Sequence, residues 1–256
     1  MRLDEVVALQ AGVSRSRARS LILAGRVRVD GNVATKAGRN VRENAQIDVE
    51  RARTYVSRGG EKLEHALKSF GVDASGKRAL DIGASTGGFT DCLLQFGALA
   101  VTAVDVGYGQ LAWSLRNDPR VLVLERTNFR GIAEDALGEP FDLIVIDASF
   151  ISLRTLVERA RSFLASDGVI VALVKPQFEA GPERVRRGGV VRDPEVHAAV
   201  LREVRDAMES LGLHVVALVP SPLLGPAGNR EFFVELRTAG DSITDATILQ
   251  VAGVGR

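Results

Sequence analysis

From about residue 77 onward, short apolar runs alternate along the chain with amphipathic segments. The runs have the length and the Val, Ile and Leu content of buried strands, and the segments between them show helical spacing. Strands are predicted at 79–82, 100–104, 121–124, 143–146, 169–174, 214–219 and 232–236, and helices at 89–96, 151–164 and 195–211. This alternation predicts an α/β fold with a doubly wound, largely parallel sheet, whose ligand lies beyond the carboxyl ends of the strands.

The first fifty residues show a different pattern and predict a small α+β domain. A second short helix is expected between Ser14, a favourable N-cap, and Gly25, a favourable stop. The dipeptide Asp30-Gly31 follows an alternating segment and predicts a tight hairpin, and a further strand is expected at 46–49. An earlier apolar set, Leu3, Val6, Val7 and Leu9, predicts a first short helix, and the side chains expected to form the buried side of the second helix are Leu21, Ile22 and Leu23.

Residues 51–60 are small or polar and end in two glycines, which predicts a linker, and residues 61–70 return to helical spacing. The predicted organisation is a small domain at 1–50, the linker at 51–60, a large domain at 61–238 and a C-terminal tail at 239–256.

The charge of the chain is unevenly distributed. Residues 1–62 contain 13 Lys and Arg against 7 Asp and Glu, a net charge of +6, while the remainder contains 20 against 25, a net charge of −5. A basic segment on a mildly acidic body favours contact with a polyanion such as nucleic acid. A solvated basic face on a structural domain would give the same balance.

Several classes of protein are disfavoured by composition. Cys92 is the only cysteine, so an intramolecular disulfide and a cysteine-cluster zinc site are excluded. The three histidines lack metal-ligand spacing, and we predict no metal. No apolar run approaches the roughly 20 residues that cross a bilayer, and no secretory signal is visible, so the sequence predicts no membrane association and a cytoplasmic protein.

The first predicted strand of the large domain leads into a glycine-rich loop, and the next strand ends at Asp105. Gly83 permits a tight turn, Gly87 and Gly88 let a cofactor approach, and Asp105 is placed to accept hydrogen bonds from ribose hydroxyls. The loop lacks the dinucleotide pattern G-x-G-x-x-G and fits S-adenosylmethionine better. Asn128, after the third strand, is placed for an adenine amino group, although it could be only a turn residue. The predicted cofactor residues are Asp81, Gly83, Ser85, Thr86, Gly87, Gly88, Phe89, Asp105 and Asn128.

Four charged side chains form the predicted catalytic set. Asp147 and Lys175 each follow an apolar strand directly, so they lie at the carboxyl edge of the sheet. Glu231 begins the last strand, and if that strand runs antiparallel, as in methyltransferase sheets, Glu231 lies beside Lys175. Lys62 precedes the sheet on a helix that could fold back over the same edge.

Such a set suits methyl transfer to a ribose 2′-hydroxyl. That hydroxyl is a weak acid, so the enzyme must align it and remove or stabilise one proton. A lysine near a second cation and shielded from water loses its proton more readily. We assign the base to Lys175, its orientation to Asp147 and Glu231, and contact with the hydroxyl or a phosphate to Lys62, although the sequence does not decide which lysine takes the proton.

Two resemblances to known families follow from these residues. The two helices, the hairpin and the V-DG turn resemble the S4-like RNA-binding domain, whose arginine-bearing second helix and hairpin contact RNA. The contacts that this resemblance implies are Arg15, Arg17, Arg19, Arg26 and Arg28. The ordered Lys-Asp-Lys-Glu set resembles the tetrad of FtsJ-type ribose 2′-O-methyltransferases.

With the stretches VSRGGEKLEHAL, ALDIGASTGGFTDCLL, LVKPQFEAG and GNREFF, the chain resembles the TlyA family over nearly all of residues 2–238. The resemblance implies a Rossmann-like class I methyltransferase fold with a seven-stranded mixed sheet, S-adenosylmethionine as cofactor and ribosomal subunits as partners. It further implies methylation of cytidine 2′-hydroxyls in 23S rRNA, in some members also in 16S rRNA, at sites that influence susceptibility to capreomycin-type antibiotics. The oligomeric state stays open.

Three alternatives remain beside this interpretation. Members of the family are also labelled hemolysins, which would require a membrane-inserting segment that the sequence does not show. A catalytically silent RNA-binding factor is a second alternative. Methylation of a base is a third, disfavoured because DASF stands where an N/D-P-P-Y/F-type motif would be expected. The segment 178–191 predicts a mobile basic loop in which Arg184, Arg186 and Arg187 could contact RNA or simply be solvated.

Overall fold

The computed structural model describes residues 1–42, 44–49, 54–181, 183–185 and 188–255. The chain divides into two compact units, Met1–Thr54 and Tyr55–Arg256, and each has a hydrophobic core of its own. Among the described residues no helix is both long enough and apolar enough to span a membrane.

The small unit packs two helices on a three-stranded antiparallel sheet of order β2-β1-β3. Its elements are α1 (Leu3–Ala11), α2 (Arg15–Leu23), β1 (Val27–Val29), β2 (Asn32–Val33) and β3 (Ile47–Val49). The predicted hairpin is confirmed, because Asp30 and Gly31 adopt φ angles of 51° and 78° between β1 and β2. Two positive φ angles are what a two-residue hairpin turn of the right twist requires.

One of the three apolar positions expected to be buried on the second helix, Leu23, is exposed instead, and Leu9 of the first helix is exposed as well. Leu9 is 81% exposed and Leu23 is 69% exposed, whereas Leu21 and Ile22 are buried. Leu21 and Ile22 lie three and four positions after the buried Ala18 and continue its stripe, whereas Leu23 lies five positions after Ala18 and points to solvent.

The large unit is built on a seven-stranded mixed sheet of order β6-β5-β4-β7-β8-β10-β9, as predicted. β10 runs antiparallel to β8 and β9, and the other neighbouring strands pair in parallel. The strands are β4 (Arg78–Ile82), β5 (Ala100–Val104), β6 (Val121–Leu124), β7 (Phe141–Ile146), β8 (Leu164–Val174), β9 (His214–Pro220) and β10 (Phe232–Arg237). All seven predicted strands are present.

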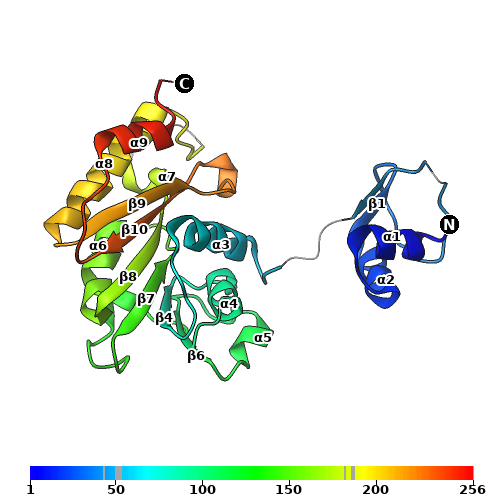
Figure 1. Ribbon diagram of the computed structural model, residues 1–256, viewed down its shortest axis with the longest axis horizontal. Helices are drawn as coiled ribbons and strands as arrows, with labels where there is room; N and C mark the ends of the chain where they lie inside the picture. The colour runs from blue at the N-terminus through cyan, green and yellow to red at the C-terminus, as the bar shows by residue number, and fades with distance from the viewer. Residues whose placement is uncertain (43, 50–53, 182, 186–187, 256) are drawn as a thin grey trace. The chain divides into compact units, whose positions relative to one another are not determined.

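Helices cover both faces of this sheet (Figure 1). The core of one face contains side chains from α3, α4 and α5, and the core of the other face contains side chains from α6, α8 and α9. The helices of the large unit are α3 (Arg58–Phe70), α4 (Gly88–Gln95), α5 (Trp113–Arg116), α6 (Leu153–Ala160), α7 (Pro176–Glu179), α8 (Pro194–Ser210) and α9 (Asp245–Ala252). Because both faces of the central strands are covered, these strands are mainly apolar instead of alternating.

The predicted linker is shorter than 51–60. Residues 51–53 lie outside the described residues, and α3 begins at Arg58 with Ser57 as its N-cap, so the two glycines belong to the first turn of the helix. A Cβ at Gly60 would lie 2.2 Å from the ring of Tyr55. The glycines therefore permit close packing and do not mark a chain break.

The segment expected as a tail ends in a helix that belongs to the large unit. Ile248 and Ala252 of α9 are fully buried in one of its two cores. Asp245, in the first turn of α9, forms ion pairs with Arg202 and Arg205 of α8 at 2.8 and 2.6 Å.

Candidate functional site

The glycine loop between β4 and α4 is shaped by contacts within the protein. Gly83 has a φ of 89°, and a Cβ there would lie 2.5 Å from the carbonyl oxygen of Asp147. At Gly87 a Cβ would lie 2.3 Å from Leu115, and at Gly88 it would lie 2.2 Å from Ser57 Oγ. Gly87 and Gly88 therefore make room for neighbouring side chains, and their part in admitting a cofactor stays a prediction.

A cavity of about 310 Å³ opens at the carboxyl edge of the sheet beside this loop. All four members of the predicted catalytic set line it, together with the start of α3 and the loop residues between β4 and α4. Its lining residues are Ser57, Arg58, Gly59, Lys62, Gly83, Ala84, Ser85, Thr86, Gly88, Phe89, Asp147, Ser149, Lys175 and Glu231.

Lys175 is held by two neighbours from the loop after β7. Its Nζ lies 2.6 Å from Asp147 Oδ1, as an ion pair outside hydrogen-bond alignment, and donates a hydrogen bond to Ser149 Oγ at 3.0 Å. The lysine side chain is only 11% exposed. Because β7 and β8 are parallel neighbours, the residues that follow them meet at one edge of the sheet.

Glu231 pairs with Lys62 and not with Lys175, which corrects the expected arrangement. Lys62 Nζ donates a 2.6 Å hydrogen bond to Glu231 Oε2, and both side chains are buried. The lysine reaches this position from the first half of α3, whose residues Arg58, Gly59 and Lys62 line the cavity. A Cβ at Gly225 would lie 2.1 Å from Glu231 Oε1, so glycine at 225 leaves space for the carboxylate.

Arg230, which precedes Glu231, joins the start of β10 to the C-terminal helix. Its guanidinium donates hydrogen bonds of 2.9 Å to the carbonyl oxygens of Ala252 and Val251 at the end of α9. A cation at a helix C-terminus satisfies carbonyls that have no partner in the helix.

A second cavity, of about 390 Å³, adjoins the first and shares Gly83, Ser85, Asp147 and Ser149 with it. Asp105 and Asn128 lie on its wall among apolar side chains. Asp105 accepts hydrogen bonds from Ser85 N at 2.8 Å and from Gly107 N at 2.6 Å, one at each oxygen. Its carboxylate is therefore fixed, and each oxygen retains a lone pair for a ligand.

The sequence predicts Asp81 as a cofactor residue, but Asp81 lines neither cavity. It is fully buried beneath the loop and accepts a 2.6 Å hydrogen bond from Thr90 at one oxygen, while the other has no partner among the described residues. Burial raises the pKa of Asp81 to about 7, and the charge of Asp147 adds to this rise, whereas the bond from Thr90 lowers the pKa. Asp81 thus ties α4 to β4 from below.

The raised pKa of Asp81 predicts a pH-dependent stability. The folded state keeps a proton that the unfolded chain releases at a pKa of 3.8, so the free energy of unfolding falls as the pH rises from 3.8 to about 7. In the Asp81→Asn variant we expect the free energy of unfolding not to fall over this pH range, because asparagine does not titrate. Its side-chain oxygen can still accept the hydrogen bond from Thr90. Chemical denaturation of the wild type and the variant at several pH values between 4 and 7.5 measures their free energies of unfolding. The same pH dependence in both proteins would contradict a raised pKa of Asp81.

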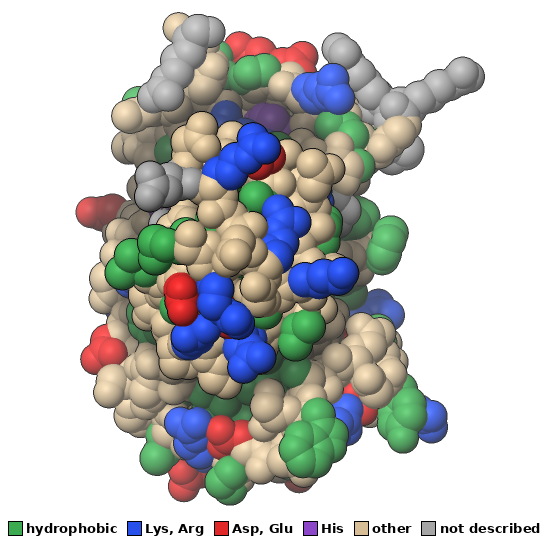
Figure 2. Space-filling model, turned by 90° about the vertical axis from the view of Figure 1, so that its right-hand side faces the viewer, with side chains coloured by type: hydrophobic (Ala, Val, Ile, Leu, Met, Phe, Trp, Pro, Cys, Tyr) green, Lys and Arg blue, Asp and Glu red, His purple; other side chains and the backbone are tan. Residues whose placement is uncertain are grey.

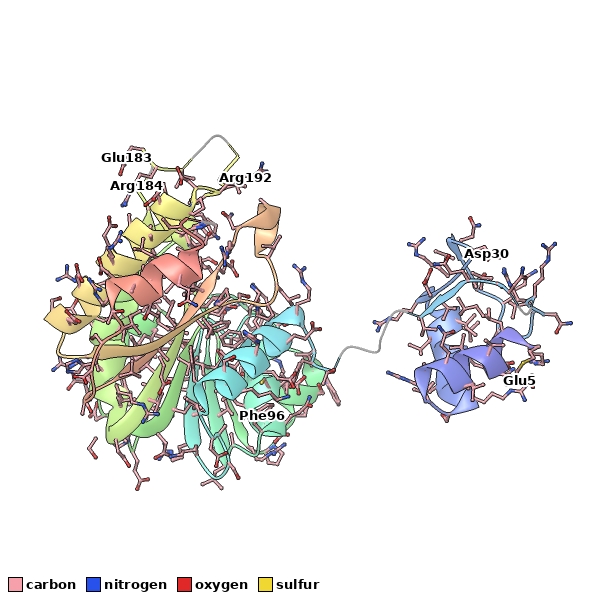
Figure 3. The ribbon with its side chains drawn as sticks, turned by 45° about the horizontal axis from the view of Figure 1, so that its top comes forward. Glu5, Asp30, Phe96, Glu183, Arg184 and Arg192 are labelled. Carbon is pink, nitrogen blue, oxygen red and sulfur yellow. The ribbon has the colours of Figure 1, made fainter. Side chains whose placement is uncertain are left out.

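The basic loop between α7 and α8 is only partly described, since Arg186 and Arg187 lie outside the described residues. Figure 3 places Glu183, Arg184 and Arg192 on this loop. The guanidinium of Arg184 forms a bidentate pair with Glu203 of α8 at 2.7 and 2.9 Å. This arginine, expected to contact RNA or water, is thus engaged within the protein.

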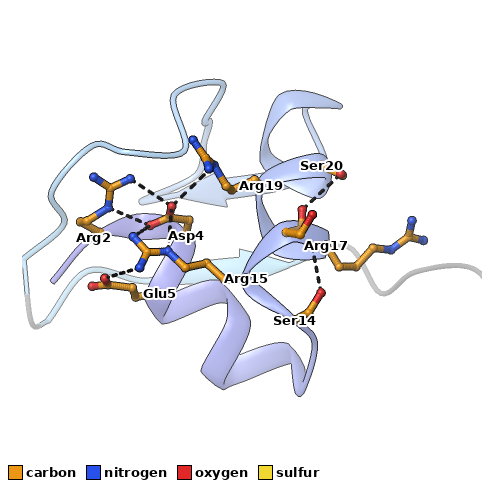
Figure 4. A network of polar contacts seen from close by, with 9 residues as sticks. Arg2, Asp4, Glu5, Ser14, Arg15, Arg17, Arg19 and Ser20 are labelled. Carbon is orange, nitrogen blue, oxygen red and sulfur yellow. Dashed lines mark hydrogen bonds and ion pairs between the residues drawn. The ribbon is translucent and has the colours of Figure 1, made fainter.

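Lys and Arg side chains are spread over the N-terminal unit in the space-filling view (Figure 2). Of the five predicted RNA contacts, Arg15 and Arg19 meet at the buried carboxylate of Asp4, at 3.3 and 3.9 Å. Arg17 extends away from that carboxylate (Figure 4). Arg28 is exposed on β1, and its guanidinium donates to Gly31 O at 3.2 Å, whereas Arg26 precedes the strand and is half-buried.

Sequence reasoning missed three residues. Ser149 holds Lys175, and a serine two positions after a strand-end acid is the signal that could have indicated it. Phe150 is 90% exposed with a φ of 64° and lies 4.9 Å from the ring of Phe178, a strained position without any sequence signal. Arg2 joins Arg15 at Asp4, with Nε of Arg2 3.1 Å from the carboxylate.

Comparisons with known proteins match both units. The profile of the FtsJ-like methyltransferases matches residues 55–238, and that of the S4 domain matches residues 1–47. A Mycobacterium tuberculosis protein described as 16S/23S rRNA (cytidine-2'-O)-methyltransferase TlyA is 49% identical over 98% of this chain and 95% of its own length. The 23S rRNA (cytidine-2'-O)-methyltransferase TlyA of Campylobacter jejuni is 32% identical over 91% and 98%. The solved structure of a Streptococcus thermophilus protein described as a candidate hemolysin has a TM-score of 0.77 at 38% identity and covers 99% of this chain and 94% of that chain.

Proposed function

The chain belongs to the TlyA family of FtsJ-like methyltransferases, and on that premise we propose that it methylates the 2′-hydroxyl of cytidine in ribosomal RNA. The observation that carries the proposal is the pair of lysine–carboxylate contacts on one cavity wall, Lys62 with Glu231 and Lys175 with Asp147. Relatives at 49% and 32% identity are described as acting on 16S/23S and on 23S rRNA, so both subunits are candidate substrates.

The second cavity fits S-adenosylmethionine. Its apolar lining suits an adenine ring, and Asp105, fixed by two backbone bonds, has lone pairs left to accept bonds from ribose hydroxyls. Asn128 lies on the wall of the same cavity, and the loop residues Ser85 and Thr86 face the catalytic end. When bound there, S-adenosylmethionine supplies an electrophilic methyl group on a sulfonium.

Lys175 is placed to receive the hydroxyl proton. As the ribose oxygen attacks the methyl group, its proton passes to Lys175 Nζ, and Asp147 at 2.6 Å stabilises the ammonium that forms. Ser149 accepts a hydrogen bond from Nζ and restricts its direction. Because the lysine is almost shielded from water, little solvent must reorganise during this step.

The Lys62–Glu231 pair has a different role in the proposed reaction, which is to hold the acceptor oxygen. Glu231 is fully buried, so it holds the Lys62 ammonium at the cavity wall, where that ammonium can donate to the ribose oxygen or a neighbouring phosphate. Attack on a methyl group requires an in-line approach, and fixing the acceptor oxygen supplies much of that alignment.

The N-terminal unit supplies affinity for the substrate. It matches the S4 domain, and residues 1–54 contain 11 Lys and Arg against 6 Asp and Glu, a net charge of +5. Basic side chains give a contribution to RNA binding that depends on phosphates and not on sequence. Because the proposed substrate is ribosomal RNA, we also propose a cytoplasmic location for the protein.

Methyl transfer to isolated ribosomal subunits tests the proposal. We expect labelled methyl from S-adenosylmethionine to enter unmethylated 50S or 30S subunits, and nuclease digestion to release the label as 2′-O-methylcytidine. Label in a base would support base methylation instead. Binding of subunits without any label would support the silent RNA-binding alternative, and both results would contradict the proposed reaction.

A further inference from the structure

Glu179 connects the two segments that meet at Lys175. It is the last residue of α7, the single helical turn that follows Lys175. One carboxylate oxygen of Glu179 accepts a 2.8 Å hydrogen bond from Leu153 N, and the other accepts a 3.1 Å bond from Ser152 Oγ. Ser152 ends the loop after β7, the same loop that begins with Asp147. This loop and the turn after β8 are therefore joined twice, by Lys175 at one end and by Glu179 at the other.

Glu179 also takes the place of a capping side chain at the start of α6. Ser152 is the N-cap residue of this helix, but its hydroxyl makes no capping bond and donates to Glu179 instead. The first backbone N–H groups of a helix have no partner within it, and the bond from Leu153 N satisfies one of them. A negative charge at this end is favourable for the helix dipole as well. The side chain of Glu179 is therefore held in place by α6.

A contact between two aromatic rings joins the same two segments. Phe150 lies in the loop after β7, Phe178 lies in α7, and their ring centroids are 4.9 Å apart. Phe150 is exposed and has a positive φ, which is unfavourable for a residue with a side chain. Such a conformation persists only where the surroundings fix the backbone. The bonds to Glu179 fix the end of this loop.

Glu179 acts at a distance from the reacting groups. It is not among the described residues that line the cavity of about 310 Å³, so any effect on the reaction passes through residues that do. We propose that Glu179 is a positioning residue, which holds the loop of Asp147 and Ser149 against Lys175 and so sets the direction of Lys175 Nζ. This inference rests on the proposed function, in which Lys175 takes the hydroxyl proton.

Two conservative substitutions separate the geometry of Glu179 from its charge. Glu179→Gln keeps the length of the side chain, so its oxygen can accept from Leu153 N and its amide can donate to Ser152 Oγ. Glu179→Asp keeps the charge, but it is one methylene shorter and cannot reach both partners unless the loop moves. At saturating S-adenosylmethionine we expect Glu179→Gln to keep nearly the wild-type single-turnover rate. We expect Glu179→Asp to be about tenfold slower, with a much smaller change in KM for ribosomal subunits, because small displacements misalign reacting groups.

Combination with Lys175→Ala shows whether Glu179 acts through Lys175. If it does, the double variant with Glu179→Asp is no slower than Lys175→Ala alone, because the group that Glu179 positions is already absent. Independent effects would multiply and make the double variant about a further tenfold slower. The matched control for the loss of a helix cap is Thr244→Ala, which removes the hydroxyl that caps α9 and is expected to keep the wild-type rate.

Chemical labelling of lysines tests the inference without methyl transfer. The ion pair with Asp147 favours the unreactive ammonium form of Lys175, whose side chain is almost shielded from water. Lys62 is equally shielded and paired with Glu231, so it serves as an internal reference. Mass spectrometry measures how fast acetic anhydride modifies each lysine. We expect the ratio of Lys175 to Lys62 to rise about threefold in Glu179→Asp and to stay unchanged in Glu179→Gln, because only the shorter side chain loosens the ion pair.

Three results would overturn the inference: a Glu179→Gln variant as slow as Glu179→Asp, an unchanged labelling ratio in folded Glu179→Asp, or a double variant slower than Lys175→Ala. Circular dichroism and thermal unfolding report whether each variant folds. If Glu179→Asp does not fold, Ser152→Ala replaces it in every comparison with the same directions expected, because it removes one of the two bonds. A wild-type enzyme with the expected labelling but without methyl transfer would contradict the proposed function and not the placement of Glu179.

Discussion

Replacing Lys175 with alanine is expected to lower the rate of methyl transfer by about 10³-fold, within the range that general bases contribute. The substitution removes the group that takes the ribose proton and leaves Asp147 without its partner. Rapid-quench measurement with excess enzyme, labelled S-adenosylmethionine and ribosomal subunits separates the chemical step from product release.

Lys175→Arg distinguishes a base from a positive charge. Arginine stays protonated in proteins and cannot accept the proton, so we expect this variant to be about as slow as Lys175→Ala. If Lys175 only neutralises charge, the arginine variant will retain much of the rate. Lys68→Ala, which removes an exposed lysine from α3, is the matched control. Equal labelling by Lys175→Ala and the wild type would contradict the assignment of Lys175 as the general base.

Gly83→Ala is expected to destabilise the protein by roughly 3 kcal/mol, because it combines an unfavourable backbone angle with overpacking. The new Cβ would lie 2.5 Å from Asp147 O, so the loop after β4 and the loop after β7 cannot both keep their positions. We also expect the folded fraction to lose at least about 10²-fold in methyl transfer, since small displacements misalign the reacting groups.

Gly138→Ala separates the effect of the backbone angle from the effect of overpacking. Gly138 has a φ of 74°, similar to that of Gly83, but a Cβ there would meet nothing within 4 Å. We expect it to cost only about 1–2 kcal/mol and to leave the rate unchanged. Chemical denaturation and the rate assay measure both effects. Similar losses for the two variants would show that the contact with Asp147 is unimportant.

The strands and the edge that carries the site could be predicted from the sequence. Buried parallel strands leave long apolar runs, and a charge directly after such a run, as at Asp147 and Lys175, is fixed at the carboxyl edge by the parallel pairing. Glu231 begins the last strand, and because this strand runs antiparallel to its neighbours, its first residue lies at the edge where the parallel strands end.

The partners of these charges could not be predicted in the same way. Which lysine Glu231 contacts depends on the path of α3, a helix outside the sheet whose position is set by packing against Tyr55 and α4. The role of Gly88 escaped sequence reasoning for the same reason, because it faces Ser57, thirty-one positions earlier in the chain. Asp81 resembles a cofactor residue by position, and only its burial shows that it lies beneath the loop.

The hydrogen bonds from Arg230 to the last helix show that the folded unit and the match to the family profile end at different residues. Similarity to the FtsJ-like methyltransferases ends at residue 238, but the guanidinium next to Glu231 is anchored on the carbonyls of Val251 and Ala252. The folded unit therefore extends past the last residue that the family profile matches. A truncation designed from the family match alone would uncover an apolar face and detach the anchor at the entrance to β10.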